Sequence, residues 1–379
     1  MTVVSEAQNA VQAVLDEYVS TGGEMGLQAA AYLDGRQVVD AWAGVADLET
    51  GRPYDGDTLT TVFSVTKGVA STAVHLLAER GQIRYDEVVA NYWPEFGVNG
   101  KEMVTVGQAL SHQAGIPQVP AGIGPTDLMD WDRVVKAVAL EIPLWVPGTA
   151  PGYHSITHGW IVGGLVEAVD GRRIDRFVRE ELLAPIGMAD HFYLGLPESE
   201  DGRLAPLTMD DVLRADASPV PESYARLAVP PAFYPLGDSA NLTEVRRAVV
   251  PGYGGIATAR ALARLYAVMI SGVDGVRLFP DERVRAMSAL QTDAWDLVLD
   301  AADPKGIGYF LGRPDSPMGT RISTFGHPGY GGSIAFADPD YGFAFALVKN
   351  RLRGDSPDSR SVAMDAARAV RLSLDIPED

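Results

Sequence analysis

Strand-like sequences occur at both ends of this 379-residue chain and are separated by a mainly helical middle. Near the N-terminus, the stretch LQAAAYLDGRQVVDAWAG has two apolar runs joined by Asp34-Gly35, a pair that tolerates the positive φ of a tight hairpin turn. Near the C-terminus, four short β-rich runs follow one another: GIGYFLG, RISTFG, GSIAFAD and YGFAFALVKN. This order predicts one antiparallel sheet completed by both chain ends, with a helical domain inserted between them.

The expected fold class is therefore α+β, with an antiparallel sheet flanked by helices. We place residues 1–80 and 252–379 in the sheet domain and residues 81–251 in the inserted, mainly helical domain. Apolar periodicity predicts helices over the ranges 126–141, 155–169, 173–183, 258–270 and 359–374. The Pro-rich range 197–251 lacks clear periodicity, so we expect irregular surface loops there that roof a cleft.

The composition excludes several classes of partner. A formal charge of −19 would repel nucleic acid and anionic lipid surfaces, and no run approaches the roughly 20 apolar residues of a membrane span. The absence of cysteine rules out disulfides and thiolate metal sites, and the first residues lack the pattern of a signal peptide. We expect a cytoplasmic protein without metal or cofactor, since no His/Asp/Glu cluster has metal spacing. The oligomeric state stays open.

The stretch TVFSVTKGVA places Ser64 three residues before Lys67, at the start of an apolar run that predicts a buried helix. The chain has 31 basic residues but only five lysines. Burial can shift lysine toward its neutral form, whereas arginine keeps its proton. On a helix the two side chains share a face, so a neutral Lys67 amine could accept the Ser64 proton. The N-terminal end of the helix would also favour a developing oxyanion beside Ser64.

A Ser-x-x-Lys pair is common by chance, so a nucleophile site also needs a second proton-transfer group and a donor strand. Two later segments supply them: Tyr153-His154-Ser155 and His327-Pro328-Gly329. With these three elements in order, the chain resembles the serine β-lactamase and penicillin-binding-protein superfamily, specifically its class C β-lactamase-like esterase branch, the family VIII carboxylesterases. Further signatures are LSHQAGIP, LLAPIGMAD and GYGGIATARALARL, and the resemblance covers roughly residues 27–375.

The resemblance implies roles for five residues. Ser64 would attack a carbonyl, Lys67 would take its proton, and Tyr153, as phenol or phenolate, would relay a proton to the leaving group. The backbone N–H groups of Ser64 and Tyr330 would form the oxyanion hole, and Gly329 would permit close approach of the substrate. The expected activity is a serine hydrolase that forms an acyl-enzyme.

Two departures from the lactamase pattern bear on the substrate. Ser155 replaces an asparagine that contacts substrate in lactamases, and His327 replaces a lysine, which removes a fixed cation for a substrate carboxylate. His327 should be mostly neutral near pH 7 and should regain part of that charge below about pH 6.5. Ser155 and His327 are still expected on the substrate side. We therefore predict a carboxylesterase for small, uncharged esters with short or medium acyl groups.

Several alternatives remain open at this stage. An acyltransferase, an amidase or D-amino-acid peptidase, or a weak β-lactamase would use the same acyl-enzyme. A non-catalytic binding protein is a further alternative, against which the intact Ser64, Lys67 and Tyr153 argue. We interpret His112 as a structural hydrogen-bonding residue, and the pair in YHSITH, His154 and His158, as helix-surface or packing residues.

Overall fold

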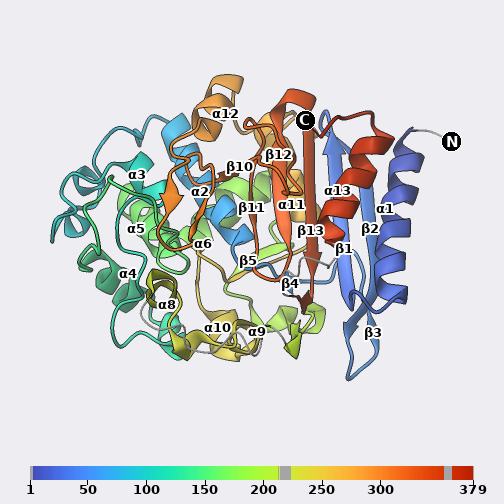
Figure 1. Ribbon diagram of the computed structural model, residues 1–379, viewed down its shortest axis with the longest axis horizontal. Coiled ribbons are helices and arrows are strands. Elements are labelled where there is room, and N and C mark those ends of the chain that lie inside the picture. The colour runs from blue at the N-terminus through green and yellow to red at the C-terminus, as the bar shows by residue number, and fades with distance from the viewer. Residues whose placement is uncertain (1–2, 212, 214–222, 354–360, 379) are drawn as a thin grey trace.

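A seven-stranded antiparallel sheet, in the order β10-β11-β12-β13-β1-β2-β3, runs through the computed structural model, which describes residues 3–211, 213, 223–353 and 361–378 (Figure 1). Its N-terminal strands are β1 (Gly26–Leu33), β2 (Arg36–Asp47) and β3 (Arg52–Pro53). Its C-terminal strands are β10 (Phe310–Leu311), β11 (Phe325–Pro328), β12 (Ile334–Asp338) and β13 (Phe343–Lys349). Because β13 pairs with β1, the two chain ends meet inside the sheet. The predicted α+β fold is confirmed, whereas the proposed domain boundaries stay a prediction.

The tight turn between β1 and β2 forms where the sequence predicts it. Asp34 and Gly35 both have positive φ, 47° and 75°, as a two-residue hairpin turn requires. A Cβ atom on Gly35 would lie 1.9 Å from the carbonyl oxygen of Gly272, so the position also needs glycine for close packing. The hairpin is thereby fixed against the chain after α11 (Ala259–Ile270).

Alternate residues of the central strands enter two separate cores, because successive side chains of a strand point to opposite faces. One core lies between the sheet and the helices α2 (Val65–Glu79) and α11, and receives Ala30 and Tyr32 of β1. The other lies under α1 (Val3–Ser20) and α13 (Val362–Ser373), and receives Leu27, Ala29 and Ala31. In Figure 1, α1 and α13 lie together along the outer side of the sheet, and the helical part lies on the opposite side.

The helical middle contains α3 (Val106–Leu110), α4 (Trp131–Ala139), α5 (His158–Asp170) and α6 (Ile174–Phe177). The helix predicted over 126–141 begins as a 3₁₀ turn, Pro125–Met129, and restarts as α4 because the Asp130 side chain caps the backbone N–H of Arg133. The helix predicted over 173–183 widens after α6 into a π-helical stretch, Val178–Leu183. The helix predicted over 258–270 corresponds to α11.

The prediction of irregular loops over 197–251 is wrong for much of that range. Its described residues form three short α-helices, α8 (Tyr224–Ala228), α9 (Leu236–Asn241) and α10 (Thr243–Arg247), together with the strand β6 (Thr208–Met209). Helices of five or six residues complete less than two turns, so no 3.6-residue period becomes visible in the sequence. Residues 212 and 214–222 lie outside the described residues, and the expected roof over a cleft stays a prediction.

The remaining elements are short. The strands β4 (Thr60–Thr61), β7 (Gly255–Ala257) and β5 (Phe192–Leu194) form a small sheet of their own. β8 (Trp295–Asp296) pairs with β9 (Ala301–Ala302), β14 (Arg351–Leu352) pairs with β6, and α12 is Asp281–Ser288. Further 3₁₀ turns are Val89–Asn91, Pro94–Phe96, Ala184–Ile186, Glu198–Arg203, Pro231–Phe233 and Pro339–Tyr341. Across the described ranges, no helix has the length and apolarity to cross a bilayer.

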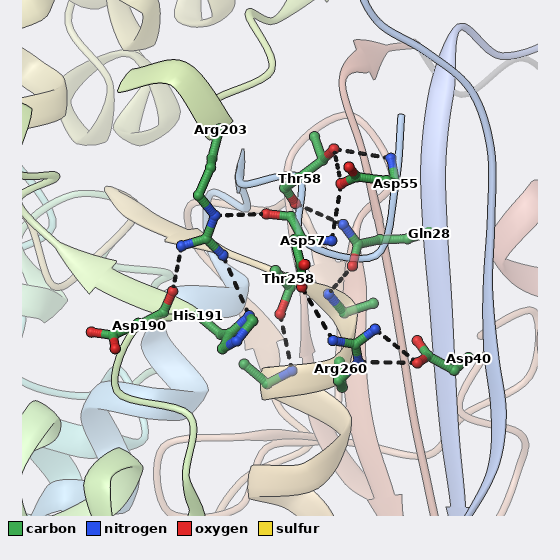
Figure 2. Close-up of polar contacts among 12 residues, drawn as sticks. Gln28, Asp40, Asp55, Asp57, Thr58, Asp190, His191, Arg203, Thr258 and Arg260 are labelled. Atoms are coloured by element: carbon green, nitrogen blue, oxygen red, sulfur yellow. Dashed lines mark hydrogen bonds and ion pairs between the residues drawn. The ribbon is translucent and has the colours of Figure 1, made fainter. Parts of the chain in front are cut away.

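A polar cluster fixes the loop that leads into β4 (Figure 2). The buried Gln28 amide of β1 donates to the carbonyl oxygen of Thr58 at 2.7 Å and accepts from the backbone N–H of Ala259 at 2.9 Å. On the same loop, Asp57 contacts the guanidinium groups of Arg203 and Arg260, through its carbonyl and carboxylate oxygens respectively. The loop is thus joined to the large sheet and to the start of α11.

We predict that Gln28→Leu lowers the free energy of unfolding by about 1–3 kcal/mol, because a buried carbonyl and a buried N–H lose their partner. Urea unfolding followed by tryptophan fluorescence measures the change. The exposed Gln37, on the same hairpin, provides the matched control Gln37→Leu. Equal stability of the two variants would contradict the anchoring role of Gln28.

Candidate active site

Ser64 lies at the N-terminus of α2, immediately after a strained turn. The preceding Phe63 has a φ of 47°, a conformation that costs a non-glycine residue about 1–3 kcal/mol and persists only where the surroundings hold it. The Phe63 ring is buried and meets the Tyr330 ring edge-on, with centroids 5.6 Å apart. Throughout residues 58–78, all of which are described, every residue except Ser64 is buried. The turn therefore exposes one hydroxyl from an otherwise buried segment.

Lys67 lies one turn further along α2 and is fully buried. Its Nζ is 3.0 Å from Ser64 Oγ, as the three-residue spacing predicts. It also donates to the carbonyl oxygens of Ser155 and Gly252, both at 2.7 Å. The described contacts of Lys67 include no carboxylate, and burial lowers the pKa of the amine well below its ordinary value.

These three contacts orient the neutral form of Lys67. A neutral amine has two N–H donors and one lone pair, and carbonyl oxygens can only accept hydrogen bonds. The two N–H groups are therefore used by Ser155 and Gly252. In this neutral form the lone pair would be left to accept the Ser64 proton, whereas the protonated amine donates to Ser64 Oγ.

Tyr153 completes the group around Ser64. The ring centroid of Tyr153 is 4.9 Å from Lys67 Nζ. Burial raises the pKa of the phenol, the nearby Ser64 hydroxyl lowers it in part, and the charge of Asp296 raises it further. The structure thus brings Ser64, Lys67 and Tyr153 together, with Tyr153 as a protonated phenol.

His327 lies near Tyr153 at the end of β11, but it is nearly inaccessible. The residue is 1% exposed, and the centroid of its ring lies 6.0 Å from that of the Tyr153 ring and 5.0 Å from that of the Phe310 ring. Nδ1 contacts the Pro328 carbonyl oxygen at 2.7 Å, and Nε2 is buried without a hydrogen-bond partner. Burial lowers the pKa of His327 well below its ordinary value, so the expected gain of charge below about pH 6.5 is wrong.

Gly329 brings the end of β11 against the turn that carries Ser64. A Cβ atom at this position would lie 2.3 Å from the carbonyl oxygen of Val62 and 3.2 Å from the side chain of Val65. The Gly329 N–H donates to Ser333 at 2.7 Å, which closes the loop that contains Tyr330. The predicted use of the Tyr330 N–H in an oxyanion hole remains a proposal, and this close approach supports it.

The three histidines near Tyr153 are buried and serve as internal hydrogen-bonding groups. His112 Nδ1 accepts from the backbone N–H of His154 at 3.0 Å, and His154 Nε2 accepts from the N–H of Ile116 at 3.1 Å. Burial lowers the pKa of His154 to about 4 and that of His158 to about 3, so both are neutral. Of the two expected positions, helix surface or packing, both residues take the packing one. Among the described residues, no group of three or more ligand-type side chains could hold a metal ion.

Sequence reasoning missed three groups that touch the site. Two are the carbonyl oxygens of Ser155 and Gly252, which any residue type would provide, so the sequence carries no signal for them. The carbonyl oxygen of Ser155 accepts from Lys67, while the substrate-side role of its side chain stays a prediction. The third is Asp296, whose carboxylate accepts from the backbone N–H of Tyr153 at 2.9 Å.

The sequence matches known proteins along most of its length. A protein-family model described as Beta-lactamase matches residues 11–369. The protein named Esterase/beta-lactamase LipL, from Mycobacterium tuberculosis, is 37% identical over 337 residues, which cover 85% of this chain and 76% of that protein.

Two solved structures have the same fold at similar identity. The crystal structure of a family VIII carboxylesterase superposes with a TM-score of 0.88 at 32% identity, covering 97% of this chain and 98% of the other. The structure described as a novel penicillin-binding protein homolog from Caulobacter crescentus gives a TM-score of 0.85 at 35% identity, with the same two coverages.

We predict that Gly329→Ala slows the covalent labelling of Ser64 by a fluorophosphonate by about a hundredfold, because displacement of the loop by roughly 1 Å misplaces the reacting groups. Intact-protein mass spectrometry over time gives the rate. Gly202→Ala is the matched control, since a Cβ atom there would meet no atom within 4 Å. Equal labelling rates for both variants would show that the approach of β11 does not matter to Ser64.

Proposed function

This chain belongs to the beta-lactamase family, and we propose that it is a serine carboxylic ester hydrolase that forms an acyl-enzyme on Ser64. The contacts of Lys67 carry the proposal. A buried amine whose two N–H groups are engaged by carbonyl oxygens offers its lone pair to Ser64, as activation of a serine nucleophile requires. The names of the relative and of the carboxylesterase structure support esters as the substrate class.

In the first half of the reaction, the Ser64 proton passes to Lys67 as Oγ bonds to the ester carbonyl carbon. The carbonyl oxygen becomes an oxyanion, which the backbone N–H groups of Ser64 and Tyr330 stabilise. The bond to the alcohol oxygen then breaks, and that oxygen takes the phenol proton of Tyr153. Lys67 returns the proton to Tyr153. The products are the acyl-enzyme and a free alcohol.

In the second half, water replaces the alcohol. The water oxygen bonds to the acyl carbon as its proton passes to Lys67, and the bond between Ser64 Oγ and the acyl carbon breaks. Ser64 regains its proton, and the carboxylic acid leaves. The raised pKa of Tyr153 suits it to donate a proton rather than to accept one at neutral pH.

We further propose that the substrates are small esters without a charged acid group. His327 is buried and neutral where the family pattern has lysine, so this position supplies no cation for a substrate carboxylate. His327 and Ser155 therefore favour esters of uncharged acids, and short or medium acyl groups are part of the same proposal. A cytoplasmic location, proposed from the absence of cysteine, agrees with small-molecule esters rather than extracellular peptides.

Weak β-lactam hydrolysis is the second candidate, because the relative of 37% identity is named both an esterase and a β-lactamase. It would use the same acyl-enzyme on Ser64. A single assay panel separates the two candidates.

We predict turnover of p-nitrophenyl acetate and butyrate, with kcat/KM well above that for a chromogenic cephalosporin, and loss of both activities in Ser64→Ala. Ser71→Ala, which alters a fully buried serine two turns along the same helix, is the matched control and should stay active. Cephalosporin turnover that exceeds ester turnover would reverse the order of the two candidates. Full ester turnover by Ser64→Ala would reject both.

We predict that kcat/KM for a neutral p-nitrophenyl ester rises with pH as Lys67 loses its proton, and then reaches a plateau. The pKa of Lys67 is depressed by burial, so the half-maximal rate should occur well below about pH 10.4, the ordinary value for lysine. Lys67→Arg should be inactive at every pH, because arginine does not release its proton. A rise centred on the ordinary lysine value, or an active Lys67→Arg, would remove Lys67 as the base.

A further inference from the structure

A buried ion pair lies next to the backbone of Tyr153. Its two members come from a segment far away from Tyr153 in the sequence. The carboxylate of Asp296, the last residue of β8, lies 3.0 Å from Nζ of Lys305. Their side chains are 0% and 1% exposed. Neither residue contacts Ser64 in the described structure, so the proposed mechanism does not use them.

The second carboxylate oxygen of Asp296 accepts three hydrogen bonds from backbone N–H groups. Oδ1 accepts from the N–H groups of Tyr153, Val298 and Leu299, each at 2.9 Å. Two of these bonds fix the turn that follows β8, and the third ties that turn to Tyr153. Because bonds to a charged acceptor are roughly twice as strong as neutral ones, this carboxylate is a firm support for the Tyr153 backbone.

The same segment supports Tyr153 in two further ways. The N–H of Leu297 donates to the carbonyl oxygen of Pro151 at 3.0 Å, so the turn is also hydrogen-bonded to the segment just before Tyr153. On the other side of the pair, Lys305 Nζ lies 5.2 Å from the ring centroid of Phe310, and the Phe310 ring packs 5.7 Å from that of Tyr153. Backbone and ring of Tyr153 are thus both held by elements that the ion pair organises.

Stability alone is a weak explanation for such a pair. The desolvation of two buried charges commonly offsets their attraction, and apolar replacements of similar size are often no less stable. A fixed geometry is a better reason, because three N–H groups hold one carboxylate oxygen while the Lys305 ammonium lies 3.0 Å from the other. The pair holds the backbone of the residue whose phenol must reach Ser64.

We propose that Asp296, anchored by Lys305, is a positioning residue for Tyr153 and keeps the phenol beside Ser64 in the proposed ester hydrolysis. The assignment rests on the proposed function, since it gives Tyr153 its proton-donating task. The charge of Asp296 adds to burial in raising the pKa of Tyr153, which keeps the phenol protonated. Asp296 touches neither the substrate nor the reacting atoms.

The test is a double-mutant cycle on ester turnover. Asp296→Asn keeps the size of the side chain but removes its charge, and should lower kcat by about ten- to a hundredfold, the range for hydrogen bonds to charged groups, with little change in KM. In a Tyr153→Phe background, where no phenol remains to be placed, the same substitution should cause almost no further loss. A merely structural role would give equal losses in both backgrounds.

Asp338→Asn is the matched control. Asp338 is also fully buried and paired, with Arg321, but it lies at the end of β12 that pairs with Phe325, away from Gly329. It should lower the melting temperature without changing kcat of the folded protein. A loss of kcat equal to that of Asp296→Asn would overturn the proposal, because any buried charge would then suffice.

A second variant and a measurement on the wild-type protein complete the test. If Asp296→Asn does not fold, Asp296→Asn with Lys305→Met removes both charges together and avoids an unpaired buried cation, and the same loss is expected. Wild-type ester turnover is measured first, since its absence would count against the proposed function and this assignment together. Normal wild-type turnover with an unimpaired Asp296→Asn would overturn the positioning role alone.

Discussion

The architecture of the site depends on one buried amine. Lys67 leaves water completely, and the cost of that burial is met by hydrogen bonds from its N–H groups to Ser155 and Gly252. These carbonyl oxygens belong to two segments far apart in sequence, one before α5 and one before β7. The amine therefore joins three parts of the chain while it stays 3.0 Å from Ser64 Oγ. Loss of either carbonyl contact would alter both the packing and the proton affinity of the group.

The sequence was informative where a local pattern alone determines the structure. The Asp34-Gly35 turn, the N-terminal strands and the buried helix after Ser64 follow from short-range patterns and form as predicted. Of the four C-terminal runs, GSIAFAD and YGFAFALVKN form strands over most of their length, whereas GIGYFLG and RISTFG each contribute two strand residues. The short helices α8–α10 were missed because five or six residues complete less than two turns, too few for the 3.6-residue period to show. In the site, Ser64, Lys67 and Tyr153 could be found because their side chains carry the chemistry.

The parts of the site that were missed either contact residues far away in the sequence or use backbone atoms instead of side chains. Asp296 reaches Tyr153 across 143 residues, and no local pattern indicates such a contact. The burial of His327 depends on rings from other segments, so its protonation could not be inferred from its residue type. The scarcity of lysine points to buried lysines in general, but only Lys67 was interpreted in this way from the sequence. Four of the five lysines, Lys67, Lys101, Lys305 and Lys349, are buried, while arginine serves most exposed ion pairs.

The pairing of β13 with β1 also has a consequence for synthesis on the ribosome. The N-terminal hairpin is made first, yet the strand that covers the free side of β1 ends only at Lys349. Until then, an almost wholly buried strand of the finished protein presents unpaired N–H and C=O groups, the kind of edge that recruits other strands. The nascent chain therefore passes through a long aggregation-prone interval, and its acidic net charge of −19 helps to keep such chains apart.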